Sequence, residues 1–436
     1  MYNVNSLENH WMPFTANRDF KANPRIVTGA KGIRLTDHKG GSVLDGSSGL
    51  FCTPLGHGRE DIADAVRDQL LQTDYVAPFQ LGHSGSFELA SLVSRILPDE
   101  FNHVFFTNSG SESIDTALKM VMAYHRAKGD GQRVRMVSRE RAYHGVNIGG
   151  VSLSGMVKNR ETFSGVMPNV VCMRHTWNPE ERFVKGQPES GAELAEDLSR
   201  MIETYGASTI AACFVEPVAG STGCLPPPKG YLERLREICT ENGILLVFDE
   251  VITGFGRLGK PFAAQVFGVT PDIITMAKAL TNGCQPMGAV GVRDEIYSTI
   301  TEASPENAIE FFHGYTYSGH PAACAAGIVT QKAFTEEGHF DNAAAIMDDF
   351  QDKVMELKDL DIVYDVRTCG LMSAVEIRKD GVAPGALGTE AQKKMFWNGL
   401  HIKFTGDNGI IAPAFVYTTD DVVELVDAFR KTLLEL

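Results

Sequence analysis

Short apolar runs alternate with amphipathic stretches between residues 103 and 292, and this alternation predicts the fold class. The apolar runs are rich in β-branched or aromatic residues and have the length of buried strands: 103–107, 134–138, 211–217, 244–250, 272–276 and 287–292. Segments 112–129 and 230–243 lie between them and have the apolar spacing of helices. Strands that alternate with helices form a mainly parallel sheet covered by helices, so we predict an α/β domain.

The pattern changes after about residue 320. Two long helical patterns, 320–334 and 342–360, precede short strand-like runs at 371–377, 401–406 and 409–415. This order predicts a smaller α+β domain, with which the short β signals of the first 50 residues are expected to pack. The 436 residues are enough for two domains. We therefore predict an N-terminal segment over 1–55, a large domain over 56–318 and a small domain over 319–436.

Composition narrows the class of partner. The formal net charge is −15 and no block of Lys and Arg offsets it, which argues against nucleic acid or an anionic membrane. The N-terminus lacks a signal-peptide pattern, and no apolar run approaches the roughly 18–20 residues of a membrane span. The eight cysteines have no C-x-x-C spacing and mostly lie in apolar contexts. This pattern indicates buried, reduced thiols in a cytoplasmic protein rather than disulfides or a zinc site.

Two of the apolar runs end in a single charge that a buried strand would not need. Residues 244–250 deliver Asp249, and residues 272–276 are followed by Lys278. In an open α/β sheet, the loops at the carboxyl ends of the strands line the ligand crevice. An amine and a carboxylate at that edge are the two groups that pyridoxal phosphate needs, for covalent attachment and for keeping its ring nitrogen protonated. Asp249 alone could equally form a salt bridge to an arginine or cap the next turn.

Two further segments place suitable groups after predicted strands. Residues 107–112 read Thr-Asn-Ser-Gly-Ser-Glu at the start of a helical pattern, and small residues at a helix N-terminus can cradle a phosphate. The same pattern fits a simple cap made by Ser109 or Ser111. Tyr143 follows the run 134–138, where its ring could stack on a flat cofactor or belong to the core.

Other ligands are weighed and rejected. Gly254, Gly256 and Gly259 match G-x-G-x-x-G after a strand, the pattern of a dinucleotide-binding turn. Four residues separate Asp249 from the first glycine, however, and Pro261 disrupts the long helix that this motif requires. No G-x-x-x-x-G-K-[ST] motif is present, and the histidines in 313–320 have no further ligands in register for a metal.

Taken together, these segments resemble the class III, fold-type-I pyridoxal phosphate aminotransferases. The similarity runs nearly from end to end. The chain is similar in particular to the branch of omega-amino acid:pyruvate (β-alanine:pyruvate) transaminases. The motifs that carry it are HWMPFTANR, NHVFFTNSGSES, YHGVN, FVEPVAGS, DEVITGFGR, GVTPDIITMAKALTNG, PMGAV and HGYTYSGHP. The resemblance implies a large domain with a mainly parallel seven-stranded sheet and a smaller α+β domain.

The resemblance also implies a role for individual residues. Lys278 would attach the cofactor and, once released, move a proton between the substrate α-carbon and the cofactor, while Asp249 would pair with the pyridine nitrogen. The remaining cofactor-binding residues would be Ser109, Gly110 and Ser111 at the phosphate, Tyr143 and Val251 on the two ring faces, His144, Glu216 near the substrate side, and Thr316 at the phosphate of a neighbouring subunit's cofactor. The last role implies a homodimer, with a tetramer as an alternative.

The expected substrate pocket departs from the family pattern. An arginine binds the substrate carboxylate in that branch, whereas this chain has Lys403, which keeps the charge but loses the planar bidentate geometry. Lys403 either binds the substrate carboxylate less rigidly than an arginine would or does not bind it. Phe14 and Phe51 stand where tyrosine and tryptophan are common, and with Phe79 they suggest a more apolar pocket.

We therefore predict transfer of an amino group from a primary amine or ω-amino acid to a small keto acid such as pyruvate. The alternatives are an amine transaminase that acts on donors without a carboxylate, or an aminomutase or decarboxylating relative on the same scaffold. A non-catalytic pyridoxal phosphate-binding protein would lack turnover, and a nicotinamide dehydrogenase would lack pyridoxal absorbance.

Overall fold

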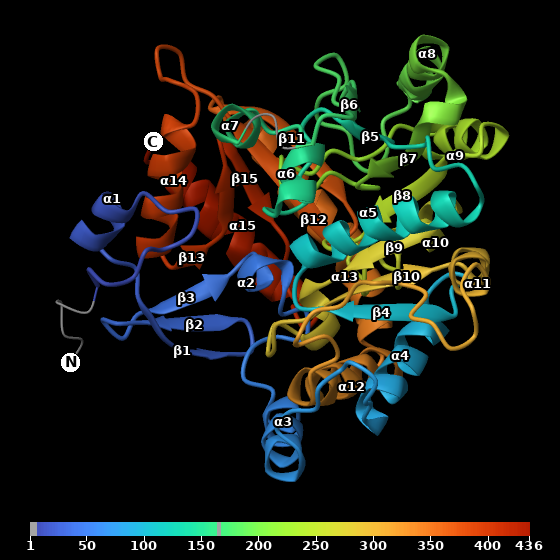
Figure 1. The fold of residues 1–436 in the computed structure, drawn as a ribbon. Coiled ribbons are helices and arrows are strands. Elements are labelled where there is room, and N and C mark those ends of the chain that lie inside the picture. The colour runs from blue at the N-terminus through green and yellow to red at the C-terminus, as the bar shows by residue number, and fades with distance from the viewer. Residues whose placement is uncertain (1–6, 164–166) are drawn as a thin grey trace.

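The computed structural model describes residues 7–163 and 167–436, and its centre is a seven-stranded sheet (Figure 1). The strands run, in spatial order, β4 (His103–Thr107), β10 (Gly288–Val292), β9 (Ile273–Met276), β8 (Leu245–Asp249), β7 (Ile210–Val215), β5 (Arg135–Arg139) and β6 (Val170–Met173). Strands β6, β5, β7, β8 and β9 are parallel to one another. Strand β10 is antiparallel to both of its neighbours, β4 and β9. The predicted fold class is confirmed.

Both faces of this sheet are covered, which explains its continuous apolar strands. Successive side chains of a strand point to opposite faces. In β8, Val247 packs in a cluster with helix α5 (Gly110–Ala127), whereas Leu246 and Phe248 pack in a second cluster with α9 (Tyr231–Glu241). The second face also receives α12 (Pro321–Glu336), which contacts both α3 (Glu60–Gln72) and α4 (Ser84–Ile96).

The C-terminal part forms a four-stranded antiparallel sheet in the order β11 (Val363–Cys369), β12 (Met372–Ile377), β15 (Asn408–Ile411) and β14 (Lys403–Thr405). Helices α13 (His339–Met355), α14 (Ala386–Trp397) and α15 (Thr419–Leu433) cover it. The other helices are α1 (Asn17–Ala22), α2 (Ser48–Phe51), α6 (Ile148–Leu153), α7 (Val157–Thr162), α8 (Glu196–Tyr205), α10 (Ala263–Phe267) and α11 (Asp294–Glu302).

A third sheet joins the two ends of the chain. It consists of β1 (Val27–Lys31), β2 (Arg34–Asp37), β3 (Ser42–Asp45) and β13 (Leu400–His401), and β3 pairs in parallel with β13. Figure 1 shows these blue N-terminal strands beside the red C-terminal helices. The N-terminal strands therefore share backbone hydrogen bonds with the C-terminal part, while the proposed domain boundaries stay a prediction.

Three elements differ from the sequence prediction. The run 401–406 is not one strand, because β13 pairs with β3 while β14 pairs with β15, so the chain changes sheets at Ile402. Strand β6 is absent from the prediction because its four residues are too short to stand out. Helix α5 begins at Gly110, two residues earlier than its amphipathic pattern.

The surface and the thiols add two findings. No helix in 7–163 and 167–436 is both long and apolar enough to cross a membrane. All eight cysteines are free thiols, and five of them are buried, whereas Cys284 is exposed.

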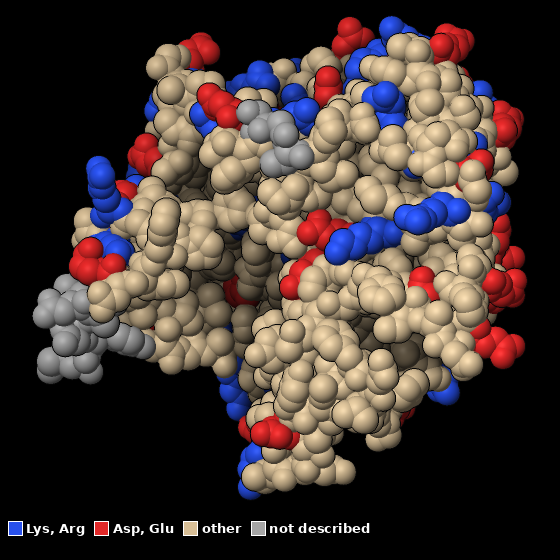
Figure 2. Space-filling model, in the orientation of Figure 1, with Lys and Arg blue, Asp and Glu red and all other residues tan. Residues whose placement is uncertain are grey.

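Figure 2 shows a hollow between the N-terminal strands and the region of α5, on a face whose charged side chains lie mostly toward the edges.

Candidate active site

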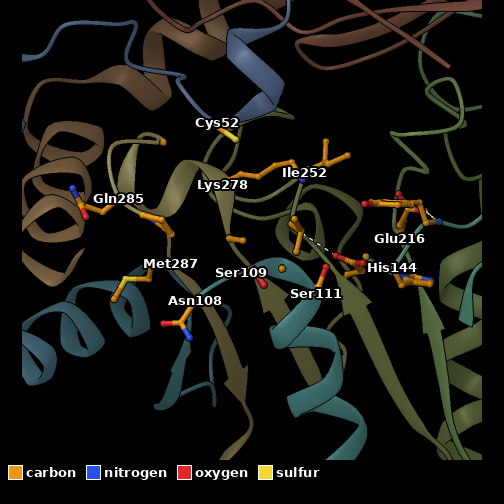
Figure 3. A pocket seen from close by; sticks show the side chains of 18 residues that line it. Cys52, Asn108, Ser109, Ser111, His144, Glu216, Ile252, Lys278, Gln285 and Met287 are labelled. Carbon is orange, nitrogen blue, oxygen red and sulfur yellow. Dashed lines mark hydrogen bonds and ion pairs between the residues drawn. The ribbon is translucent and has the colours of Figure 1, made fainter. Parts of the chain in front are cut away.

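Asp249 and Lys278 line one cavity of about 310 Å³ at the carboxyl edge of the large sheet (Figure 3). Strands β8 and β9 are parallel neighbours, and Asp249 pairs in register with Thr275. Lys278 follows β9 by two residues and begins the 3-10 helix η4 (Lys278–Thr281). Its φ of 49° is in the left-handed region, which is costly for a residue with a β-carbon and is concentrated at functional sites.

The Asp249 carboxylate is held by uncharged donors and one histidine. It is 6% exposed, and His144 Nδ1 lies 2.8 Å from Oδ2. Thr275 Oγ1 and the Val251 N–H donate to Oδ1 at 3.2 and 3.1 Å. Within the described part of the chain, the basic side chain that contacts Asp249 is therefore a histidine, whereas the sequence analysis considered an arginine. The contact from Val251 resembles the turn-capping alternative.

The neighbouring carboxylate, Glu250, is used structurally. It is fully buried and accepts hydrogen bonds from the N–H groups of Ala263 and Ala264, at 2.6 and 2.9 Å, and from Thr253 Oγ1. Burial raises the pKa of Glu250 to about 7, although these hydrogen bonds oppose the rise. Of the two adjacent acids, only Asp249 lines the cavity.

The N-terminus of α5 forms a further wall of the cavity and is suited to an anion. Ser109 is its N-cap and accepts a hydrogen bond from the Glu112 N–H at 3.2 Å, so the capping role is observed. Ser111 Oγ accepts from the Val146 N–H at 3.0 Å. The unpaired N–H groups of a helix start favour negative charge. Figure 3 shows Ser109 and Ser111 at this helix end. In this view, Lys278 lies between the two serines on one side and Cys52 on the other.

Two glycines keep this wall open. A Cβ on Gly110 would lie 3.0 Å from Val251 Cγ1. A Cβ on Gly145 would lie 2.5 Å from Ser111 Oγ and 2.8 Å from Ser111 Cα, and Gly145 also has a φ of 96°. The close approach of Gly145 to α5 therefore depends on the absence of a side chain.

Glu216 holds the segment that carries Tyr143. Its Oε1 accepts from the Tyr143 N–H at 2.9 Å, and its Oε2 accepts from the Gly220 N–H at 3.2 Å. Burial raises the pKa of the Glu216 carboxyl, and Asp249 adds to the rise while His144 opposes it. Tyr143, His144, Glu216 and Val251 all line the cavity, so the structure gathers the expected cofactor-binding residues other than Thr316.

The expected substrate residues are more dispersed. Phe51 is buried next to Cys52, which lines the cavity, and the Lys403 Nζ lies 5.9 Å from the centroid of the Phe51 ring. Phe14 and Phe79 are 82% and 58% exposed. Thr316 is also exposed, and its carbonyl accepts a hydrogen bond from the Tyr75 hydroxyl at 3.0 Å. Of the predicted substrate residues, only Tyr143 lines this cavity in the single chain. The residues that do not line it are Phe14, Phe51, Phe79 and Lys403, and Thr316 does not line it either.

Lys403 has an unusual electrostatic environment. Burial lowers its pKa to about 8, and the nearby Lys278 ammonium adds to this lowering while Glu216 opposes it. The Lys403 charge is therefore close to the reacting end of the cavity and is lost at mildly alkaline pH.

Sequence reasoning missed several lining residues, namely Cys52, Asn108, Ile252, Gln285 and Met287. Asn108 and Ile252 lie inside quoted motifs and follow strands, so strand ends were a usable signal. Gln285 and Met287 precede β10, which is antiparallel to β9. The start of an antiparallel strand reaches the same edge as the ends of its parallel neighbours, and the sequence does not reveal that direction.

Comparisons with known proteins agree with this geometry. The family model "Aminotransferase class-III" matches residues 15–433. An omega-aminotransferase of Caulobacter vibrioides is 47% identical over 433 residues, covering 99% of this chain and 98% of the relative. A beta-alanine–pyruvate aminotransferase of Pseudomonas aeruginosa is 46% identical over 430 residues, covering 98% and 96%. The omega transaminase of Pseudomonas jessenii in complex with PMP has a TM-score of 0.93 at 29% identity, covering 99% of this chain and 97% of that one.

The chain belongs to the class III aminotransferase family. It is an enzyme of the transaminase class, and its fold is that of the omega-transaminases of known structure.

We predict that Gly145→Ala weakens anion binding at the start of α5. The added methyl group would displace Ser111, so inorganic phosphate should bind the cofactor-free protein about tenfold more weakly or worse. The measurement is the phosphate dependence of the melting temperature. Gly131→Ala is the control, because a Cβ there meets nothing within 4 Å. Equal stabilisation of both variants by phosphate would contradict the anion-binding role.

Proposed function

We infer that this chain moves the amino group of an ω-amino acid or primary amine to a small keto acid, pyruvate in the first instance, with pyridoxal phosphate attached to Lys278. The observation that carries this proposal is the placement of Lys278, Asp249 and the start of α5 around one cavity. The names of the Caulobacter and Pseudomonas relatives support the substrate class.

The donor set of the cavity fits pyridoxal phosphate, on which class III aminotransferases depend. The cofactor needs a primary amine for its aldehyde, an acid for its ring nitrogen and an anion site for its phosphate. Lys278, Asp249 and the α5 N-terminus offer these groups on different walls. Gly110 and Gly145 leave room that side chains would fill.

When bound, the cofactor supplies an electron sink for the carbanion formed at the substrate α-carbon. The residues of the chain supply the rest. Asp249 holds a proton at the ring nitrogen, and His144 and Thr275 fix the orientation of its carboxylate. Tyr143 and Val251, which both line the cavity, would hold the two faces of the ring. The Lys278 amine, tethered beside the amine-bearing carbon of the substrate, would take up the proton from that carbon and hold it for its return.

Substrate recognition falls to the side of the cavity near Phe51 and Lys403. The Lys403 ammonium attracts the carboxylate of an ω-amino acid or keto acid, as a point charge rather than a bidentate clamp. The buried Phe51 ring lies behind this region, next to Cys52, which lines the cavity. This combination admits donors with and without a carboxylate, which keeps amines without a carboxylate as a second class of donor.

A homodimer completes the proposal. Phe14, Phe79 and Thr316 are exposed in the single chain, and further exposed apolar residues include Phe87 and Phe312, at 72% and 88%. Large exposed apolar side chains grouped on one protein favour association. In this assembly, Phe14, Phe79 and Thr316 act at the neighbouring subunit's cavity. The free thiols favour a reducing compartment, in line with the cytoplasm.

The half-reaction tests the function. Holoenzyme mixed with β-alanine and no keto acid should release one equivalent of aldehyde per bound cofactor and lose its visible absorbance. Added pyruvate should restore the absorbance and yield one equivalent of alanine. Continued turnover without a keto acid would instead indicate an aminomutase or a decarboxylase, and an unchanged spectrum with every amine donor would contradict transamination.

We predict that carboxylate recognition weakens with rising pH. With its pKa lowered to about 8, Lys403 is cationic below that pH and neutral above it. The KM for pyruvate should therefore rise as the pH increases from 7 to 9. The KM for propylamine, which has no carboxylate, should not show the rise that loss of the Lys403 charge causes.

Two variants isolate the role of Lys403. Lys403→Arg keeps the charge throughout this pH range and should flatten the rise in the KM for pyruvate. Lys403→Met should give a high KM for pyruvate at every pH. If Lys403→Met and the wild type have the same KM for carboxylated substrates at pH 7, Lys403 does not bind the carboxylate.

A further inference from the structure

The turn that carries Phe51 and Cys52 to the cavity has a strained backbone. Ser48, Gly49 and Phe51 have φ values of 45°, 68° and 63°. At Gly49 the pair φ 68° and ψ −90° belongs to a region that residues with a β-carbon avoid. A Cβ on Gly49 would meet only Thr53, at 3.8 Å, so the glycine is required by the conformation and not by a lack of space. Such a backbone persists only where its surroundings hold it.

The Asp45 carboxylate stabilises this turn by hydrogen bonds to its backbone. It is 2% exposed, its Oδ2 accepts from the Gly49 N–H at 2.6 Å, and its Oδ1 accepts from the Ser47 N–H at 3.2 Å. His57 Nε2 lies 2.7 Å from the same Oδ2. Burial opposes the charge, but the hydrogen bonds from His57 and Gly49 keep the pKa of the Asp45 carboxyl below its ordinary value.

Ser47 connects this turn to the strand that carries Lys403. Its hydroxyl is fully buried, accepts the Lys403 N–H at 3.0 Å and donates to the Ile410 carbonyl at 3.2 Å. Lys403 and Ile410 are paired residues of β14 and β15. One hydroxyl thus takes a donor from one strand and an acceptor from the other, from a position more than 350 residues earlier in the chain.

We propose that Ser47, supported by Asp45, is a positioning residue that fixes Phe51 and Lys403 relative to each other and so determines the preference for carboxylated substrates. The inference rests on the proposed role of Lys403. The Lys403 ammonium lies 5.9 Å from the centroid of the Phe51 ring, so the cationic and apolar groups come from two segments. Hydrogen bonds of Gly46 and Ser48 also join these segments, at His401 and Ala412, but the Ser47 hydroxyl is the side chain that contacts Lys403 itself. A shift of either segment changes the distance between the charge and the substrate carboxylate, with little effect on Lys278.

Ser47→Ala tests the coupling. Loss of the two buried hydrogen bonds of this hydroxyl should raise the KM for β-alanine about three- to tenfold. The KM for propylamine, which lacks the carboxylate, and kcat for both donors should change less than about twofold. The inhibition constant of propionate, a carboxylate without an amine, should rise in parallel with the KM for β-alanine and reports binding without turnover.

A matched control separates positioning from general stability. Ser373 is a fully buried serine whose hydroxyl has no hydrogen-bond partner within residues 7–163 and 167–436. Ser373→Ala should therefore leave both KM values and the melting temperature unchanged. Gly49→Ala perturbs the same turn through its backbone conformation and should shift the β-alanine to propylamine preference in the same direction as Ser47→Ala, which keeps the test open if one variant folds poorly.

A double-mutant cycle gives the deciding result. In a Lys403→Met background, Ser47→Ala should produce no further change in the affinity for propionate, because both substitutions act through the same charge. Additive effects of the two substitutions would overturn the positioning role, and so would equal losses with β-alanine and propylamine. If Lys403→Met itself leaves propionate affinity unchanged, both the proposed carboxylate site and this inference are wrong. If Lys403→Met weakens propionate binding and Ser47→Ala does not, only the inference is wrong.

Discussion

The parallel pairing of β8 with β9 is the constraint on which the active site depends. Because Asp249 pairs with Thr275, both strands end at the same level of the sheet, and the residues that follow them enter one cavity. A shift of one residue between these strands would turn the Asp249 carboxylate toward the opposite face. The packing of alternate β8 side chains into two separate clusters prevents that shift, since it would place each apolar side chain on the wrong face.

The cavity brings like charges together, and the surrounding structure offsets the cost. Asp249 and Glu216 are buried carboxylates, and each is held by backbone or side-chain donors. Lys278 lies close enough to Lys403 to contribute to the lowered pKa of Lys403, after the larger effect of burial. Groups that disturb one another in this way are typical of catalytic sites. The same closeness makes Lys403 a second nucleophilic amine beside the one to which we assign the chemistry.

Six strands of the large sheet and the residues that follow several of them could be predicted from the pattern of the chain, because buried strands and helices have distinct periodicities and strand ends gather at one edge. The seventh strand, β6, was implied only by the family resemblance. The pairing partners of short segments could not be predicted. Residues 401–406 read as one strand yet serve two sheets, and the contact of Ser47 with Lys403 joins positions far apart in the chain. Whether Asp249 meets an arginine or His144 also depends on tertiary packing. The roles proposed for Phe14, Phe79 and Thr316 depend on a second copy of the chain, because these residues are exposed and outside the cavity in the single chain.

The most direct test of the central claim is to locate the bound cofactor. Holoenzyme would be reduced with borohydride, digested and analysed by mass spectrometry for a pyridoxyl-modified lysine. The account predicts modification of Lys278, in a peptide that follows β9, with Lys403 unmodified. Modification of Lys403, or an even distribution over surface lysines, would contradict the assignment of Lys278 and Asp249 to opposite ends of one cofactor.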